Sequence, residues 1–163
     1  MSQRPTDPSA SARAAGSADG EACPMPSRGR GDDAAMIARM LDARRIAVVG
    51  LSDDVTRPSH GIGEYLMSHG FDVVPVNPNH NEVLDRPCYP TLAAVPGPID
   101  VVNVFRRPEF CADVARDAVE VGAKGLWLQS GVRSDEAREI ARKAGLDFVQ
   151  DRCLKVEHMF RDG

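Results

Sequence analysis

The residues best suited to binding chemistry follow the first apolar run of the chain, where hydroxyl groups and a cation are closely spaced. They are Gly50, Ser52, Thr56, Arg57 and Ser59. Hydroxyls and a forked guanidinium match the oxygens of a phosphate group, and a glycine lets the backbone approach a ligand closely. A helix beginning near Ser59 would also direct its N-terminal amides at a bound anion. The spacing therefore predicts a phosphate cradle, with an ordinary capped strand-to-helix turn as the alternative.

Three more segments place polar groups directly after apolar runs. They are Val76, Asn77 and Pro78; Phe105, Arg106 and Arg107; and Gln129, Ser130 and Gly131. A pair of arginines can hold phosphate, and an aromatic ring beside it can cover an adenine or an apolar chain. Amide and hydroxyl groups beside a glycine supply neutral donors and acceptors. The alternatives are a solvated pair of arginines and a simple turn before the next helix.

Groups that could act as catalysts are scattered along the chain. The four histidines are His60, His69, His80 and His158, and only His158 directly follows an acidic residue. We expect His60 to lie on the surface of a first helical turn, with contact to a phosphate in the cradle as the alternative. We expect Glu157 and His158 to lie on an extended segment, where adjacent side chains point to opposite sides. Because the strand ends bring together no nucleophile, base and orienting group, no catalytic residue is assigned and a non-catalytic role is favoured.

The four cysteines are far apart and form no C-x-x-C pair, so neither a metal site nor a disulfide framework is expected. Free thiols fit a reducing cytoplasm. Cys153 lies beyond the last expected strand, where it could form a mixed disulfide with a ligand thiol or accept an acyl group. The alternative is the role of a small, buried apolar side chain.

Apolar runs and helical patterns alternate along the chain and would position these segments. The expected strands are Arg45–Val49, Phe71–Val76, Asp100–Phe105, Gly125–Gln129 and Leu146–Gln150. The expected helices are Asp33–Leu41, Ser59–His69, Pro108–Gly122 and Ser134–Gly145. The proline-rich segment 77–98 predicts a loop with one helical turn near Thr91–Ala94.

Runs that are apolar on both faces and are separated by helices indicate a parallel sheet covered on both sides. We therefore predict an α/β protein with a Rossmann-like, doubly wound, mainly parallel five-stranded sheet and helices on both faces. In such a sheet, ligands bind beyond the carboxyl ends of the strands. All the candidate binding segments would meet at that edge.

Composition sets the domain organisation and excludes some classes of function. The 163 residues support one domain; residues 1–31, rich in small and polar residues, are expected to form a disordered tail, and residues 32–163 the folded domain. No apolar run approaches the roughly 20 residues of a membrane-spanning helix, so no membrane association is expected. A net charge of −4 and an aromatic content of 5% argue against nucleic-acid binding.

A nicotinamide dinucleotide is the default ligand of this fold, but two features disfavour it. The first loop is not G-x-G-x-x-G, since the G-x-G at Gly61 and Gly63 lies inside an expected helix. An NAD site also needs a carboxylate after the second strand to bind the ribose hydroxyl. Here the strand ends in Val76, Asn77 and Pro78. A different nucleotide is therefore favoured.

Five segments in order, RIAVVGLSDDVTRPSHGIGEYL, VVPVNPN, VNVFRR, LWLQSGV and DRCLKVEH, resemble those of the small single-domain CoA-binding proteins. These are similar to the nucleotide-binding half of the succinyl-CoA synthetase alpha subunit, and the resemblance spans residues 36–160. It implies that phosphates are held by Gly50, Ser52, Arg57 and Ser59. It implies that Val76, Asn77 and Pro78 line the nucleotide, that Phe105 and Arg106 contact the adenine or 3′-phosphate end, and that Gln129, Ser130 and Gly131 face the pantetheine arm.

The expected function is binding of coenzyme A or acyl-CoA in the cytoplasm, without catalysis. CoA carries a pyrophosphate and a 3′-phosphate monoester, which require cations and amides but no ribose-directed carboxylate. The alternatives are an NAD(P)-binding oxidoreductase-like protein and a regulatory or interaction subunit of an acyl-CoA ligase-type complex. The expected partner is thus a small molecule, with any protein partner left open.

Overall fold

The computed structural model describes residues 26–162, and the side chains of residues 33–161. The chain divides into two units, Met1–Ala35 and Met36–Gly163. Helix α2, Pro26–Leu41, begins before the residue 33 expected from the sequence. Residues 1–25 of the predicted disordered tail lie outside the described residues. Across the described part of the chain, no helix has the length and apolarity to span a bilayer.

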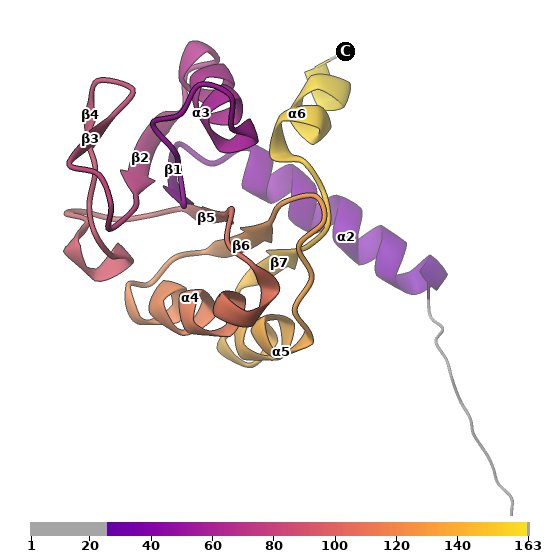
Figure 1. Ribbon diagram of the computed structural model, residues 1–163. Helices are drawn as coiled ribbons and strands as arrows, with labels where there is room; N and C mark the ends of the chain where they lie inside the picture. Colours follow the sequence, from indigo (N-terminus) through magenta and orange to yellow (C-terminus); the bar gives the residue numbers. More distant parts are fainter. Residues whose placement is uncertain (1–25, 163) are drawn as a thin grey trace, which may run out of the picture. The chain divides into compact units, whose positions relative to one another are not determined.

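The second unit is built on a five-stranded sheet in which every neighbouring pair of strands is parallel (Figure 1). Its strands are β1 Arg45–Val49, β2 Asp72–Val76, β5 Val101–Val104, β6 Gly125–Leu128 and β7 Asp147–Val149. The spatial order is β2-β1-β5-β6-β7. This arrangement confirms the predicted Rossmann-like sheet, and its topological switch point lies between β1 and β5.

The strands end level with one another at the carboxyl edge. Val49 pairs with Val76 on one side and Val104 on the other, and Val104 pairs with Leu128. The loops after β2, β1, β5 and β6 therefore start from one row of residues. This register brings segments that are far apart in the sequence to the same edge.

Alternation of side chains along the strands builds a separate apolar core on each face of the sheet. Ile46 and Val48 of β1 face α3 (Pro58–Ser68), α6 (Leu154–Asp162) and residues 36–41 of α2. Ala47 and Val49 face α4 (Pro108–Glu120), α5 (Asp135–Ala144) and the short 3-10 helix η3 (Leu92–Ala94). Helices thus cover both faces, as predicted.

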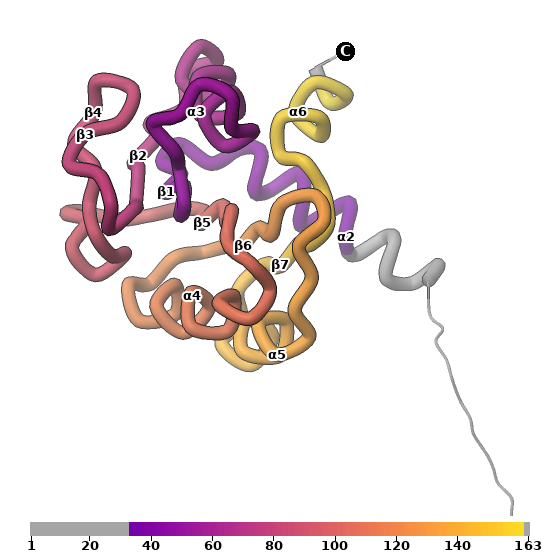
Figure 2. Tube along the Cα trace, in the orientation of Figure 1, coloured from indigo at the N-terminus to yellow at the C-terminus, as the bar shows by residue number. Residues whose placement is uncertain are grey.

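The connection from β2 to β5 contains no crossover α-helix (Figure 2). The expected helical turn near Thr91–Ala94 is present as η3. A small hairpin that the sequence did not predict, β3 (Glu82–Val83) with β4 (Arg86–Pro87), precedes it. Its turn residues, Leu84 and Asp85, have φ values of 55° and 60°, which is the left-handed backbone that a tight two-residue hairpin requires.

The last part of the chain forms a helix, so the expectation of an extended segment through Glu157 and His158 was wrong. Helix α6 begins at Leu154, whose backbone N–H donates to Gln129 Oε1 at 3.0 Å. Leu154 and His158, one helical turn apart, are both buried. The one-turn spacing of these two side chains explains the helix, because it places them on the same face.

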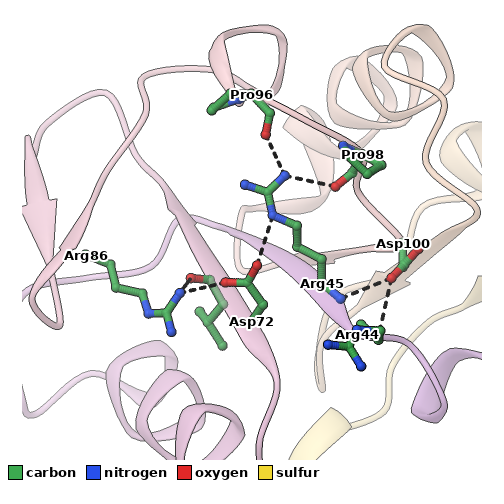
Figure 3. A network of polar contacts seen from close by, with 8 residues as sticks. Arg44, Arg45, Asp72, Arg86, Pro96, Pro98 and Asp100 are labelled. Carbon is green, nitrogen blue, oxygen red and sulfur yellow. Dashed lines mark hydrogen bonds and ion pairs between the residues drawn. The ribbon is translucent and has the colours of Figure 1, made fainter.

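A polar network joins the amino ends of β1, β2 and the segment before β5 (Figure 3). Arg45 Nε lies 3.2 Å from Asp72 Oδ2, and its Nη1 donates to the carbonyl oxygens of Pro96 and Pro98. The backbone N–H groups of Arg44 and Arg45 both donate to Asp100 Oδ2 at 3.1 Å. The network sets the register of these strands at the edge opposite the candidate site.

Candidate functional site

The turn after β1 packs directly against the end of β5. Gly50 has a φ of 88°, and its N–H donates to the Val76 carbonyl at 2.8 Å. A Cβ on Gly50 would lie 2.7 Å from the Phe105 carbonyl oxygen and 3.4 Å from Arg106 Cδ. The structure therefore brings Gly50, Val76, Phe105 and Arg106 together. The neighbouring loop by itself requires a glycine at this position, and the close approach of a ligand expected from the sequence stays a prediction.

Internal hydrogen bonds shape the loop between β1 and α3. The Ser59 hydroxyl accepts from Ser52 N–H at 3.1 Å, and the Ser52 hydroxyl accepts from Asp54 N–H at 3.0 Å. Asp54 Oδ1 in turn accepts from the hydroxyl and the N–H of Thr56. The hydroxyl donor, followed by the backbone donor, holds the pKa of Asp54 below its usual value. The predicted hydroxyl residues thus pre-form the loop.

Arg57 stands at the N-cap of α3 and leaves its cation exposed. Its backbone is extended, with φ −83° and ψ 140°, and Pro58 opens the helix at a position that needs no N–H donor. Among the described residues, Arg57 makes no ion pair or hydrogen bond through its side chain. The helix N-terminus and this guanidinium present positive charge at one place.

The loop after β2 is tied to the same turn. Asn77 Nδ2 donates to the Leu51 carbonyl at 3.1 Å, and Asn77 Oδ1 accepts from Asn79 N–H at 2.9 Å. The side chain of Leu51 is fully buried beside Gly63, where an added Cβ would lie 3.1 Å from Leu51 Cδ1. Leu51 therefore points into the core and leaves the turn open. The sequence analysis did not identify this role of Gly63. A second glycine inside an expected helix was the feature that could have indicated it.

A cavity of about 200 Å³ opens at the carboxyl ends of β1 and β2, on the α4 side. Its lining residues are Val49, Val76, Pro78, Pro90, Thr91, Leu92, Arg106, Phe110, Asp113, Val114 and Asp117. Three of these, Val76, Pro78 and Arg106, were predicted site residues. The Arg106 guanidinium carbon lies 4.9 Å from the centre of the Phe110 ring, a cation–π contact.

The contribution of α4 to this cavity was missed by sequence reasoning. Phe110, Asp113 and Asp117 follow one another at helical spacing on the face that lines the cavity. Partial burial, followed by repulsion from Glu120 and Asp113, raises the pKa of Asp117 above its usual value. Acidic residues on a helix normally mark a solvated face, so only the fold reveals these two as cavity residues.

The loop after β6 is held by the β7–α6 connection and does not line the cavity. The buried side chain of Gln129 accepts from the first residue of α6, Leu154. Gly131 N–H donates to Asp151 Oδ1 at 2.8 Å, and this bond, followed by one from Arg133, lowers the pKa of Asp151. Ser130 is exposed. A contact of this loop with a pantetheine arm stays a prediction.

Asp151 and Arg152, which follow β7, form ion pairs with different residues. Asp151 binds Arg133, and Arg152 lies 3.1 Å from Glu157 Oε2. The start of α6 carries Glu157 back towards Arg152. Cys153 is half-buried and packs against the apolar core on the α3 side.

The histidines do not assemble a catalytic group with the cavity. His60 is buried, contrary to the expected surface position, and its Nδ1 lies 3.6 Å from Glu64 Oε1. His158 Nδ1 lies 2.9 Å from the Tyr65 hydroxyl, and the ring of His69 stacks on Tyr65 at 4.0 Å. These contacts join α3 to α6. In the described part of the chain, no three His, Cys, Asp or Glu residues are grouped as metal ligands.

The strand order, the pre-formed turn at the switch point and the adjoining cavity define a nucleotide-binding class of Rossmann-like domain. Residues 44–159 match the family model of the CoA binding domain. The match spans most of the chain, and the chain belongs to this family.

Relatives and solved structures agree with this membership. The uncharacterized protein YneT of Bacillus subtilis is 40% identical over 116 residues, which cover 71% of this chain and 86% of YneT. An ADP-forming acetate–CoA ligase II from Archaeoglobus fulgidus is 29% identical over 115 residues, covering 63% of this chain but 17% of the ligase. A hypothetical protein from Pyrococcus horikoshii OT3 has a TM-score of 0.77 at 37% identity, covering 80% of this chain and 92% of that one.

Proposed function

We propose that this protein binds coenzyme A or an acyl-CoA at the carboxyl edge of its sheet and does not catalyse a reaction. The observation that carries the proposal is the position of Arg106. Its side chain lines the cavity and also passes beside the Gly50 turn. It therefore links a recess for a base with a loop suited to phosphate.

The charged side chains along this edge determine where each part of the ligand binds. Two carboxylates line the cavity and repel phosphate, so the adenine occupies the cavity and the phosphates lie outside it. The pyrophosphate lies at the N-terminus of α3 beside Arg57, where helix amides and a cation act together. The 3′-phosphate, with about −1.5 to −2 charges, pairs with Arg106 at the cavity mouth.

The absence of a carboxylate directly after β2 supports CoA over NAD. The residue at that position is Asn77, and its side chain already binds the Leu51 carbonyl and Asn79 N–H. A ribose diol would therefore find no acceptor there. The non-catalytic role is supported by His60, His69 and His158, which pack within α3 or between α3 and α6, and by the cavity lining, which includes no histidine.

Binding is tested by calorimetric titration and thermal shift with CoA, dephospho-CoA and NADH. CoA at 100 times its dissociation constant adds about 2.7 kcal/mol of stability, which raises the melting temperature by several degrees. Arg106→Ala should weaken CoA about 10- to 100-fold and dephospho-CoA less, whereas Arg57→Ala should weaken both equally. Arg138→Ala, an exposed arginine on α5, is the matched control. A shift with NADH and none with CoA would overturn the proposal.

A second candidate is a subunit of a ligase-type complex. It is favoured by the similarity to a 17% portion of an ADP-forming acetate–CoA ligase. Such a chain would hold CoA while a partner supplies the catalytic parts. The test is affinity purification of the tagged protein at native level: recovery of a stoichiometric ATP-binding subunit supports the complex, and recovery of the protein alone excludes it.

We propose the cytoplasm as the site of action, because it keeps the free thiols Cys88, Cys111 and Cys153 reduced.

A further inference from the structure

The ring of His60 holds a buried polar atom that the protein leaves without a hydrogen bond. The side chain lies in the first turn of α3 and is 9% exposed. Its Nδ1 is buried and makes no hydrogen bond within residues 26–162. Its Nε2 makes none in that range either, but this atom is not buried, so the Nε2 edge reaches the surface. Because buried polar groups are rarely left unpaired, the ring points to a partner outside the described chain.

The side of α3 that carries His60 faces the turn after β1. His60 and Gly63 are three residues apart and share this side of the helix. A Cβ on Gly63 would lie 3.1 Å from Leu51 Cδ1 and 2.9 Å from Leu84 Cδ1, so this side faces both the Gly50 turn and the β3–β4 hairpin. His60 lies nearer the amino end of α3 than Gly63. It therefore stands at the edge of the sheet where we place the pyrophosphate.

The β1–α3 loop lies within electrostatic reach of the ring. The pKa of Asp54 is lowered first by the hydrogen bond from the Thr56 hydroxyl, and the charges of Arg57 and His60 add smaller contributions. Asp54 already accepts two hydrogen bonds from Thr56, whereas the Arg57 side chain makes none in the described part of the chain. An anion held by Arg57 and the N-terminal amides of α3 would adjoin a ring edge that can donate to it.

Glu64 lies behind the ring and favours a positive charge on it. Its Oε1 is 3.6 Å from His60 Nδ1, one helical turn along α3, and its side chain is 63% exposed and free to move closer. With Nδ1–H directed at this carboxylate, the ring presents Nε2 outward. Besides Arg57, the charged or titratable residues in the loops and the hairpin on this side of α3 are mainly acidic: Asp53, Asp54, His80, Glu82, Asp85 and Arg86.

We propose that His60 binds the pyrophosphate of CoA through Nε2, as an imidazolium whose Nδ1–H is directed at Glu64. The inference rests on the proposed binding of CoA and adds a binding residue and one proton to it. When the ligand binds, the neutral ring takes a proton from the solvent at Nε2, and this N–H donates to a phosphate oxygen. Because histidine changes charge between about pH 5 and 8, affinity should rise as pH falls through this range.

The experiment uses dephospho-CoA, which lacks the 3′-phosphate monoester that itself titrates near pH 6. Any proton taken up on binding near neutral pH then belongs to the protein. Calorimetry in buffers of different ionisation enthalpy measures the dissociation constant and the proton uptake for the wild-type protein, His60→Gln and His69→Gln. Glutamine keeps an amide donor but carries no charge. His69, at the C-cap of the same helix, is the matched control, and melting curves establish that both variants are folded.

The wild-type protein and His69→Gln should take up protons on binding and should bind more weakly at pH 8 than at pH 6. His60→Gln should bind about 10- to 100-fold more weakly near pH 6 and should take up no proton. Unchanged affinity in His60→Gln would overturn the inference. A loss of affinity with proton uptake unchanged would show a structural role of the ring and would also overturn it.

Glu64→Gln provides a second test with an unusual sign. Removal of an acidic side chain near a phosphate by itself strengthens binding. If Glu64 stabilises the charged ring of His60, its replacement should instead weaken binding and reduce proton uptake. Stronger binding by Glu64→Gln would contradict the inference and leave CoA binding intact. Failure of the wild-type protein to bind either CoA or dephospho-CoA would overturn the proposed function and, with it, this inference.

Discussion

Gly50 illustrates how one residue joins three strands. Its N–H binds the end of β2, its φ of 88° turns the chain out of β1, and its missing side chain leaves room for the end of β5. Any side chain would both strain the backbone and contact the Phe105 carbonyl. The same glycine therefore serves the fold and shapes the loop on which we place the pyrophosphate.

Gly50→Ala should lower the free energy of unfolding by about 1–3 kcal/mol, since a positive φ and a 2.7 Å contact cannot both be relieved. Gly61→Ala is the matched control, because a Cβ at that helical position meets no atom within 4 Å. The control should be neutral or up to about 1 kcal/mol more stable. Urea denaturation of both variants measures the difference, and equal stabilities would contradict this account of Gly50.

At the scale of elements, two buried amides on the same face of the sheet have different roles. Gln129, after β6, accepts from the backbone at the start of α6 and anchors that helix. Asn103, in β5, is fully buried, and neither its Oδ1 nor its Nδ2 has a hydrogen-bond partner in residues 26–162. Replacing an amide that has a partner and one that lacks a partner should therefore have opposite effects.

Gln129→Leu should destabilise the protein by about 1–3 kcal/mol, because it leaves the buried N–H of Leu154 without an acceptor. Asn103→Leu should be neutral or stabilising, since it removes an unsatisfied buried amide and keeps the same branched shape. Hydrogen exchange of α6 amides should rise in the first variant alone. Destabilisation of similar size in both would show that Asn103 has a buried partner, such as an ordered water.

At the scale of the whole molecule, Asp100 at the amino edge of the sheet should make the free energy of unfolding depend on pH in the acidic range. Partial burial alone would raise the pKa of Asp100, but hydrogen bonds from Arg45 and Arg44 N–H, together with the charge of Lys124, outweigh it and lower the pKa. A carboxylate with a lowered folded-state pKa stabilises the protein above its unfolded pKa. That stabilisation is lost as pH falls from about 5 through the folded value.

Asp100→Asn should therefore flatten the dependence of unfolding free energy on pH below about 5 and reduce stability at neutral pH. Asp53→Asn, at an exposed residue of the β1–α3 loop with no side-chain hydrogen bond or ion pair among the described residues, is the matched control. Urea denaturation at a series of pH values provides the measurement. An unchanged slope in Asp100→Asn would mean that this carboxylate does not gain its hydrogen bonds on folding.

The parallel sheet was predictable because each strand is a β-branched, apolar run bounded by glycine, proline or a helix signal, as in Arg45–Val49. The hairpin around Leu84 was not predictable, because strands of two residues are too short to show an alternation of apolar and polar side chains. Helix α6 was missed because Leu154 and His158 share a face, a pattern that an apolar scan overlooks when one residue is polar.

Candidate site residues were predictable where strand ends supplied them, as with Val76, Pro78 and Arg106. Those on α4 were not, since Asp113 and Asp117 have the composition of a solvated face. Only the tertiary arrangement turns that face towards the cavity. The spacing of a helix fixes which residues share a side but does not fix which side meets a ligand.

The contact between Leu51 and Gly63 makes these two positions interdependent in evolution. Among homologues, a bulky residue after the first glycine should occur only with glycine at the helical position, whereas a small one there would release position 63 to larger side chains. A double variant with a small residue at position 51 and a larger residue at position 63 should keep the packing between the two positions. Either substitution alone should disrupt that packing. The pair can thus serve as a sequence marker for subgroups of the family.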